Sequence, residues 1–196
     1  MHRLRSVLLV IGTAIVFAVC TAMLGQVIGF SSPWLALLLM FYFMALAKLP
    51  EPFFMLPMPG ALLRFRPWEQ SGRLYRRLAV PQFGSVLRNT PLRYFNAQVY
   101  SSGADDLLSL HRRLLSVEAT HFWAAVLFTP YIAFLFLRSQ PGLSALFLLI
   151  QLLVNVYPIL HLRSARSRLA TLLKRQQARE TRVCNTRLPK DDTSAC

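Results

Sequence analysis

The sequence predicts an all-α, polytopic membrane protein with four transmembrane helices and amphipathic interfacial helices in a cytoplasmic loop. Hydrophobic residues make up 55% of the 196 residues, and they are concentrated in four apolar stretches long enough to cross a bilayer. The charged residues gather between and after these stretches, a segregation that a soluble core does not need. Any chemical site must then lie in the membrane or at its surface, so we expect a lipid or lipid-linked substrate.

The four stretches define a single transmembrane domain over residues 1–175, followed by a polar tail, residues 176–196, that is expected to be disordered. The expected spans are residues 7–30, 33–49, 120–137 and 143–162. Basic residues before the first span are also typical of a signal peptide. The apolar run continues past a normal signal core, however, which favours a retained anchor helix.

Lys and Arg residues determine the expected topology, because basic segments stay on the cytoplasmic side of a membrane. They are concentrated at the N-terminus, in the loop 50–118 and after residue 162, whereas the short connections between paired spans carry only Arg138. We therefore expect a multi-pass protein of the cell membrane with both termini and the long loop in the cytoplasm.

The net charge of +14 could indicate a nucleic-acid-binding protein. The basic residues alternate with apolar ones beside the spans, however, so anionic membrane lipids are the expected partner and nucleic acid is not.

The loop 50–118 is expected to lie along the membrane surface. Residues 50–60 read PEPFFMLPMPG, which is too rich in proline for a helix and too apolar for a solvated loop. An irregular segment in the interface and a rigid turn after the second span remain alternatives. Arginines alternate with apolar side chains over residues 68–80, which predicts a short amphipathic helix that Pro81 ends. A second amphipathic helix is predicted over 103–117 and could continue into the third span.

A first group of candidate site residues lies at the start of the third span. On one unbroken helix Glu118 lies about 60° from His121 and about 20° from His111, so all three share a face. A His paired with a carboxylate can remove the proton from an attacking hydroxyl. The alternative is a structural hydrogen-bonding histidine. Glu118 and His121 also have the EXXH spacing of di-iron bundles, but such sites need two of these motifs, so we expect neither a metal nor a bound cofactor.

A second group lies in and after the fourth span. Asn155 must find a partner within the apolar run, and Pro158 frees a backbone carbonyl nearby. Arg163, Arg166 and Arg168 could clamp a phosphate or carboxylate, such as the phosphopantetheine of an acyl donor or a lipid headgroup. Anchoring at the cytoplasmic surface explains these arginines equally well.

A third candidate is Glu69, a carboxylate in the loop that is followed by Gly72 and Tyr75. The alternative interpretation of Glu69 is a surface ion pair with Arg73.

Four motifs follow one another between about Phe65 and Arg175: FRPWEQSGRLYRRL, FNAQVY, VEATHFW and LVNVYPILHLRSARSRLATLLKR. In this order they resemble the glycosyl-4,4'-diaponeurosporenoate acyltransferase family, membrane enzymes of staphyloxanthin-type carotenoid biosynthesis. The residues that carry the resemblance are Glu69, Gly72, Tyr75, Asn96, Glu118, His121, Asn155, Arg163, Arg166, Arg168 and Leu169.

The resemblance implies transfer of a fatty acyl group from a thioester co-substrate, an acyl-CoA or acyl-carrier thioester, to a sugar hydroxyl of a glycosylated carotenoid or other glycolipid. We hypothesise that His121 is the general base and that Glu118 orients it. The expected substrate-binding residues are Glu69 and Asn96 for the acceptor, Arg163, Arg166 and Arg168 for the donor, and Asn155. A non-catalytic membrane scaffold and another isoprenoid-lipid-modifying enzyme remain alternatives, and a homo-oligomer or partner biosynthetic enzymes would be further partners.

Overall fold

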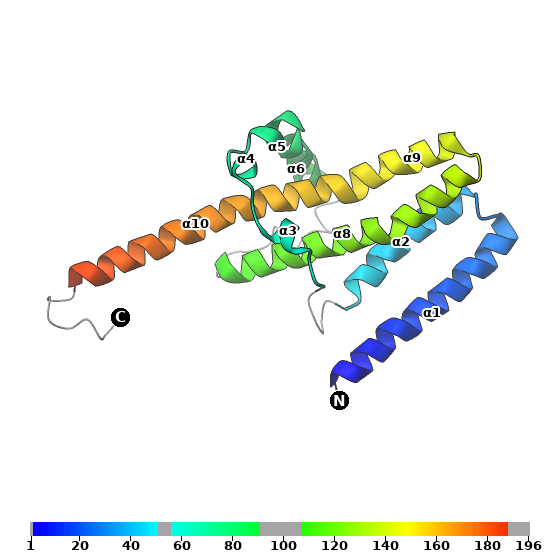
Figure 1. The fold of residues 1–196 in the computed structure, drawn as a ribbon, viewed down its shortest axis with the longest axis horizontal. Coiled ribbons are helices and arrows are strands. Elements are labelled where there is room, and N and C mark those ends of the chain that lie inside the picture. The colour runs from blue at the N-terminus through cyan, green and yellow to red at the C-terminus, as the bar shows by residue number, and fades with distance from the viewer. Residues whose placement is uncertain (1, 51–55, 91–106, 188–196) are drawn as a thin grey trace.

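The computed structural model describes residues 2–50, 56–90 and 107–187, and these residues form helices and no strand (Figure 1). The all-α fold class is thereby confirmed. The elements are α1 (His2–Ile28), α2 (Pro33–Lys48), α3 (Gly60–Leu63), α4 (Pro67–Gln70), α5 (Arg73–Arg77), α6 (Val80–Asn89), α8 (Leu107–Leu137), α9 (Pro141–Gln151), the π-turn η2 (Leu152–Val156) and α10 (Tyr157–Arg187).

Three helical segments of the described chain are long and apolar enough to cross a membrane. They are Val7–Ile28 in α1, all of α8, and Pro141–Arg179 across α9, η2 and α10. Helix α2 is apolar but has 16 residues. At about 1.5 Å per residue it is about 24 Å long, less than the roughly 30 Å of a hydrocarbon core.

Helix α8 is the centre of the bundle and packs against α2, α9 and α10, whereas α1 lies at the edge against α2 (Figure 1). The main apolar core includes Leu35, Phe128 and Leu135, which have no exposed surface. Many large apolar side chains along α1 and α9 are exposed instead. Such a surface suits lipid, because it would be unfavourable in water.

The two short connections, 29–32 and 138–140, lie at the same end of the molecule (Figure 1). The Tyr131 hydroxyl donates a hydrogen bond of 2.6 Å to the carbonyl of Phe30, which ties the first connection to α8.

The long helix formed by α9 and α10 contains a π-turn. The Tyr157 N–H bonds to the carbonyl of Leu152, five residues earlier. Pro158 has no N–H to give to the carbonyl of Val154, four residues earlier, so a regular α-helical ladder cannot continue through this point. Single π-turns of this kind are frequent at functional sites.

The helix predicted over 68–80 is broken into α4, α5 and the start of α6, which all contact α10 (Figure 1). The breaks occur where Gly72 and Ala79 adopt positive φ values of 68° and 53°. Pro81 lies in the first turn of α6 and does not end a helix. A proline is favourable there, because the N–H groups of a first turn have no helical partner.

The predicted continuation of the second amphipathic helix into the third span is confirmed, since α8 runs unbroken from Leu107 to Leu137. Helix α10 extends to Arg187, which differs from the disordered tail expected over 176–196. Gln, Ala, Arg and Glu are abundant in this segment and favour helix without any packing. Residues 51–55 of the predicted irregular segment lie outside the described chain, and residues 56–59 have no regular structure.

Candidate active site between α8 and α10

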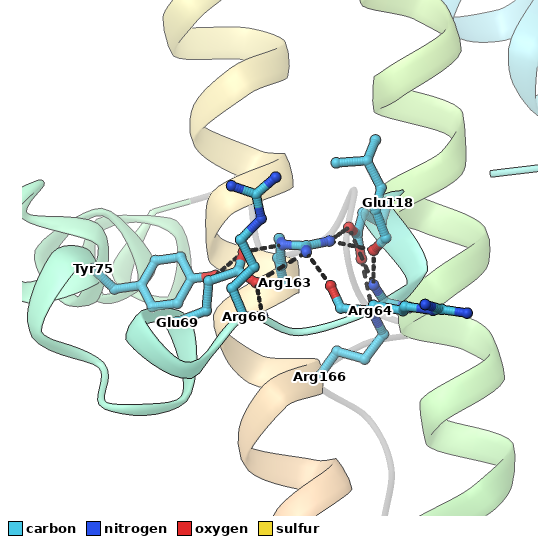
Figure 2. A network of polar contacts seen from close by, with 8 residues as sticks. Arg64, Arg66, Glu69, Tyr75, Glu118, Arg163 and Arg166 are labelled. Atoms are coloured by element: carbon cyan, nitrogen blue, oxygen red, sulfur yellow. Dashed lines mark hydrogen bonds and ion pairs between the residues drawn. The ribbon is translucent and has the colours of Figure 1, made fainter. Parts of the chain in front are cut away.

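Two glutamates and two arginines form a buried ion cluster, defined here as Glu69, Glu118, Arg163 and Arg166 (Figure 2). The two arginines are three residues apart and so share one face of α10. Glu118 reaches them from α8 and Glu69 from α4. Glu118 has 0% and Arg166 has 1% of its surface exposed, so the cluster is removed from solvent.

The ion cluster is held by paired contacts. Arg163 donates from Nε to Glu69 Oε1 at 2.5 Å and from Nη2 to Glu69 Oε2 at 3.1 Å. Arg166 Nε forms an ion pair with Glu118 Oε2 at 2.9 Å, and Arg163 Nη1 lies 3.5 Å from Glu118 Oε1. Two carboxylates thus balance two guanidinium groups, the arrangement that a buried charge requires.

The same arginines bind the segment between α3 and α4. Arg163 and Arg166 both donate to the carbonyl of Leu62, and Arg163 Nη2 donates to the carbonyl of Arg64 at 2.8 Å. Their guanidinium carbons lie 5.5 and 5.0 Å from the centre of the Phe65 ring, within the range of a cation–π interaction. The ion cluster therefore fastens the loop to α8 and α10.

Glu69 remains charged in this environment. Burial by itself would raise its pKa, but the hydrogen bonds from Arg163 and from the Arg66 N–H, together with the charge of Arg163, lower the pKa below the ordinary value. The hydroxyl of Tyr75 lies 3.4 Å from Glu69 Oε1. Burial and the charge of Glu69 raise the pKa of Tyr75 to about 12, so the phenol stays protonated.

A second polar group, the amide relay, consists of Gln151, Asn155 and His121. Gln151 Nε2 donates to the carbonyl of Ala125 at 2.9 Å, so its Oε1 is left to accept from Asn155 Nδ2 at 2.8 Å. Asn155 Oδ1 then faces His121 Nδ1 at 3.4 Å.

The Glu118 carboxylate does not meet the His121 ring, although their shared helix face predicted that Glu118 would orient it. Within the described chain Glu118 is bonded to Arg163 and Arg166, and His121 to Asn155. A buried carboxylate gains more from two cations than from a neutral imidazole. The alternative of a surface ion pair between Glu69 and Arg73 is wrong, because Glu69 is buried and pairs with Arg163.

Two further candidates from the sequence, Asn96 and His111, remain. Asn96 lies outside the described residues. His111 is partly buried, and its Nδ1 has no hydrogen-bond partner in the described chain. Among the described residues there is no group of three His, Cys, Asp or Glu side chains that could hold a metal ion.

Arg168 lies apart from Arg163 and Arg166, in a groove of about 400 Å³ between α6, α8 and α10. We name it the α6–α10 groove, and it is lined by Val80, Pro81, Arg88, Leu110, Leu114, His161, Ser164, Ala165, Arg168, Leu169 and Leu172.

Two polar residues of this region, Gln151 and Arg88, were not predicted from the sequence. Gln151 had a usable signal, because it lies four residues before Asn155 in an apolar run and so on the same helix face. Arg88 had none, because only the packing of α6 on α10 brings it to the groove.

The family model of the glycosyl-4,4'-diaponeurosporenoate acyltransferases matches residues 59–175, which is more than half of the chain. No curated protein and no solved structure matches. The matched range contains the ion cluster, the amide relay and the α6–α10 groove. The chain therefore belongs to the glycosyl-4,4'-diaponeurosporenoate acyltransferase family and is a membrane acyltransferase of carotenoid biosynthesis.

Proposed function

We propose that this enzyme transfers a fatty acyl group from a thioester donor to a sugar hydroxyl of a glycosylated carotenoid or another glycolipid, and that His121 is the general base. Family membership supports the class of reaction. The contact between His121 and Asn155 carries the assignment of the base, because it decides which ring nitrogen is free.

The amide relay determines the protonation of the ring. Gln151 donates to a backbone carbonyl, so Asn155 must donate to Gln151 and offer its Oδ1 to His121. An oxygen acceptor beside Nδ1 favours the tautomer with the proton on Nδ1. Nε2 is then the nitrogen with a free lone pair, as a general base requires.

The proposed reaction balances with these groups alone. His121 Nε2 takes the proton of the sugar hydroxyl while its oxygen attacks the thioester carbonyl carbon. A C–O bond forms, the C–S bond breaks, and the proton passes from the imidazolium to the leaving thiolate. Asn155 replaces Glu118 as the residue that positions His121, because Asn155 Oδ1 accepts from Nδ1–H throughout.

The substrate-binding roles are revised accordingly. Arg163 and Arg166 are already neutralised by Glu69 and Glu118, so they hold the loop and not the donor. Arg168 is exposed and is retained as a donor-binding residue. Asn96 is retained as an acceptor-binding residue.

We propose four spans, with α2 as the short one, and with both termini and the loop in the cytoplasm. Two observations support this topology. The two short connections lie at one end of the molecule (Figure 1). The Lys- and Arg-rich segments are the N-terminus, the long loop and the C-terminal segment, whereas the short connections carry only Arg138. Helices α3 to α6 then lie at the cytoplasmic interface, where their arginines meet anionic lipids.

The test is lipid mass spectrometry of cells that express the wild type or His121→Ala at equal abundance. Removing a general base costs roughly 10²- to 10⁴-fold in rate. We therefore expect the acylated glycolipid to be lost and its unacylated form to accumulate. Thr129→Ala on the same helix is the control, since Thr129 is exposed and its hydroxyl forms a local bond to the Ala125 carbonyl. Retention of the acylated product in His121→Ala cells would exclude His121 as the base.

A further inference from the structure

The α6–α10 groove combines two cations with an apolar lining. Arg88 comes from α6 and Arg168 from α10, and both are exposed. Both act electrostatically on the ring of His161, which lies in the same groove. Three groups that can bear positive charge thus converge on one concave surface.

Neither arginine of the groove is neutralised by the described chain. Among the described residues the carboxylates Glu69 and Glu118 are taken by Arg163 and Arg166, and neither Arg88 nor Arg168 has a carboxylate partner. This contrasts with the ion cluster, where each guanidinium is paired. An exposed arginine pair beside a groove is suited to an anion with several acceptor oxygens, such as a phosphate.

The rest of the groove suits a chain that is mainly apolar. Val80, Leu114 and Leu169 are at most 6% exposed and belong to its lining. His161 and Ser164 also line the groove and add hydrogen-bonding groups. Along the helix they lie between Asn155 of the amide relay and Arg168. A ligand with a phosphate at one end and a largely aliphatic arm that contains amides matches the two arginines, the hydrogen-bonding side chains and the apolar lining.

We propose that Arg88 and Arg168 bind the phosphate of a phosphopantetheine-bearing acyl thioester, and that its pantetheine arm follows the groove toward His121. This inference rests on the proposed function, since it names the donor of that reaction and its site. The arm would place the thioester carbonyl at His121 Nε2 and the phosphate at the far end.

The geometry of the helices supports the direction of the arm. Arg168 on α10 is thirteen residues beyond Asn155 of η2 in the same continuous helix, a rise of about 20 Å. An extended pantetheine arm can span such a length from phosphate to sulfur. On α8, Leu110 and Leu114 line the groove, and His121 lies on the same face of that helix, about 20° from Leu110.

The experiment measures binding of two inert thioethers to the full-length protein in detergent: S-tetradecyl 4'-phosphopantetheine and S-tetradecyl pantetheine, which differ only by the phosphate. We expect the wild type to bind the phosphorylated compound at least tenfold more tightly. The double variant R88Q/R168Q should lose this preference and keep its affinity for the unphosphorylated compound. R88K/R168K should recover most of the preference, because it keeps both charges.

Arg175→Gln on the exposed surface of α10 is the matched control and should bind both compounds as the wild type does. A double variant that still prefers the phosphorylated compound would overturn the proposal. The proposal would also be overturned if R88Q/R168Q lost binding to phosphatidylglycerol vesicles but kept the preference for the phosphorylated thioether. That result would assign the two arginines to the membrane surface. Binding is measured without turnover, so a failure of the proposed function in the His121→Ala test remains distinguishable from a failure of this inference.

Discussion

Glu118 is the residue whose environment differs most from its sequence-based expectation. Its carboxylate has no exposed surface and lies between Arg163 and Arg166. Removing one partner of a buried ion pair leaves an uncompensated charge and costs about 3–5 kcal/mol. The role of Glu118 is therefore to keep the two arginines and the loop in place.

Glu118→Gln should lower the stability of the protein by a few kcal/mol, because Arg163 and Arg166 would then share only Glu69. The measurement is thermal unfolding in detergent. Thr120→Ala, two residues away with a local bond to Ser116, is expected to change the unfolding midpoint little. If Glu118→Gln unfolded like the wild type but lost turnover, Glu118 would be a catalytic partner of His121 after all.

Glu69 gives the ion cluster a pH dependence. Its pKa is lowered in the folded protein, so its contribution to stability is present above the unfolded pKa of about 4.3 and is lost as the pH falls through the folded value. We expect the free energy of unfolding of the wild type to decrease below about pH 4. Glu69→Gln should be less stable at neutral pH and should lack this part of the decrease; parallel pH curves for the two proteins would contradict the prediction.

At the scale of elements, two features place side chains that helix periodicity alone would not place. The π-turn η2, beside Pro158, presents Asn155 to His121. Gly84 allows α6 to lie against α10, because a Cβ at this position would be 2.4 Å from His161 Cε1.

Gly84→Ala should push α6 away from His161 and distort the α6–α10 groove. Overpacking of this kind costs about 1–3 kcal/mol, and we expect weaker binding of S-tetradecyl 4'-phosphopantetheine along with a lower unfolding midpoint. Gly142→Ala is the matched control, since a Cβ at Gly142 meets nothing within 4 Å. Equal binding by both variants would show that the contact between Gly84 and His161 does not shape the groove.

At the scale of the whole molecule, the helices form one bundle in which the loop is fastened to α8 and α10 by the ion cluster. The exposed apolar surface of α1 and α9 suits lipid, whereas the basic loop suits a polar, anionic surface. The side of the membrane on which the loop lies depends on the topology of the chain.

Single cysteines test the topology after the three native cysteines are replaced. With four spans, an impermeant maleimide applied to intact cells should label cysteines at Ser31 and Ser139, in the two short connections. A cysteine at Ser71, between α4 and α5, should be labelled only after the cells are permeabilised. Labelling of Ser71→Cys in intact cells would place the loop on the other side of the membrane.

The helical membrane class follows from the amino-acid sequence alone, because apolar runs of this length have few stable alternatives to a helix in lipid. The sequence also predicts that Glu118 and His121 share a continuous helix, and that Asn155 needs a polar partner. These properties follow from composition and from a periodicity of 3.6 residues, and both are local.

The partner of each polar side chain depends on how the helices pack and became known from the structure. Glu118 was expected beside His121, yet the register of α8 against α10 places Glu118 at Arg163 and Arg166 and places His121 at Asn155. Arg88 and Arg168, far apart in the sequence, meet in one groove for the same reason. The periodicity of a helix determines on which face of that helix a side chain lies. The residue that this side chain contacts on a neighbouring helix depends on how the two helices pack.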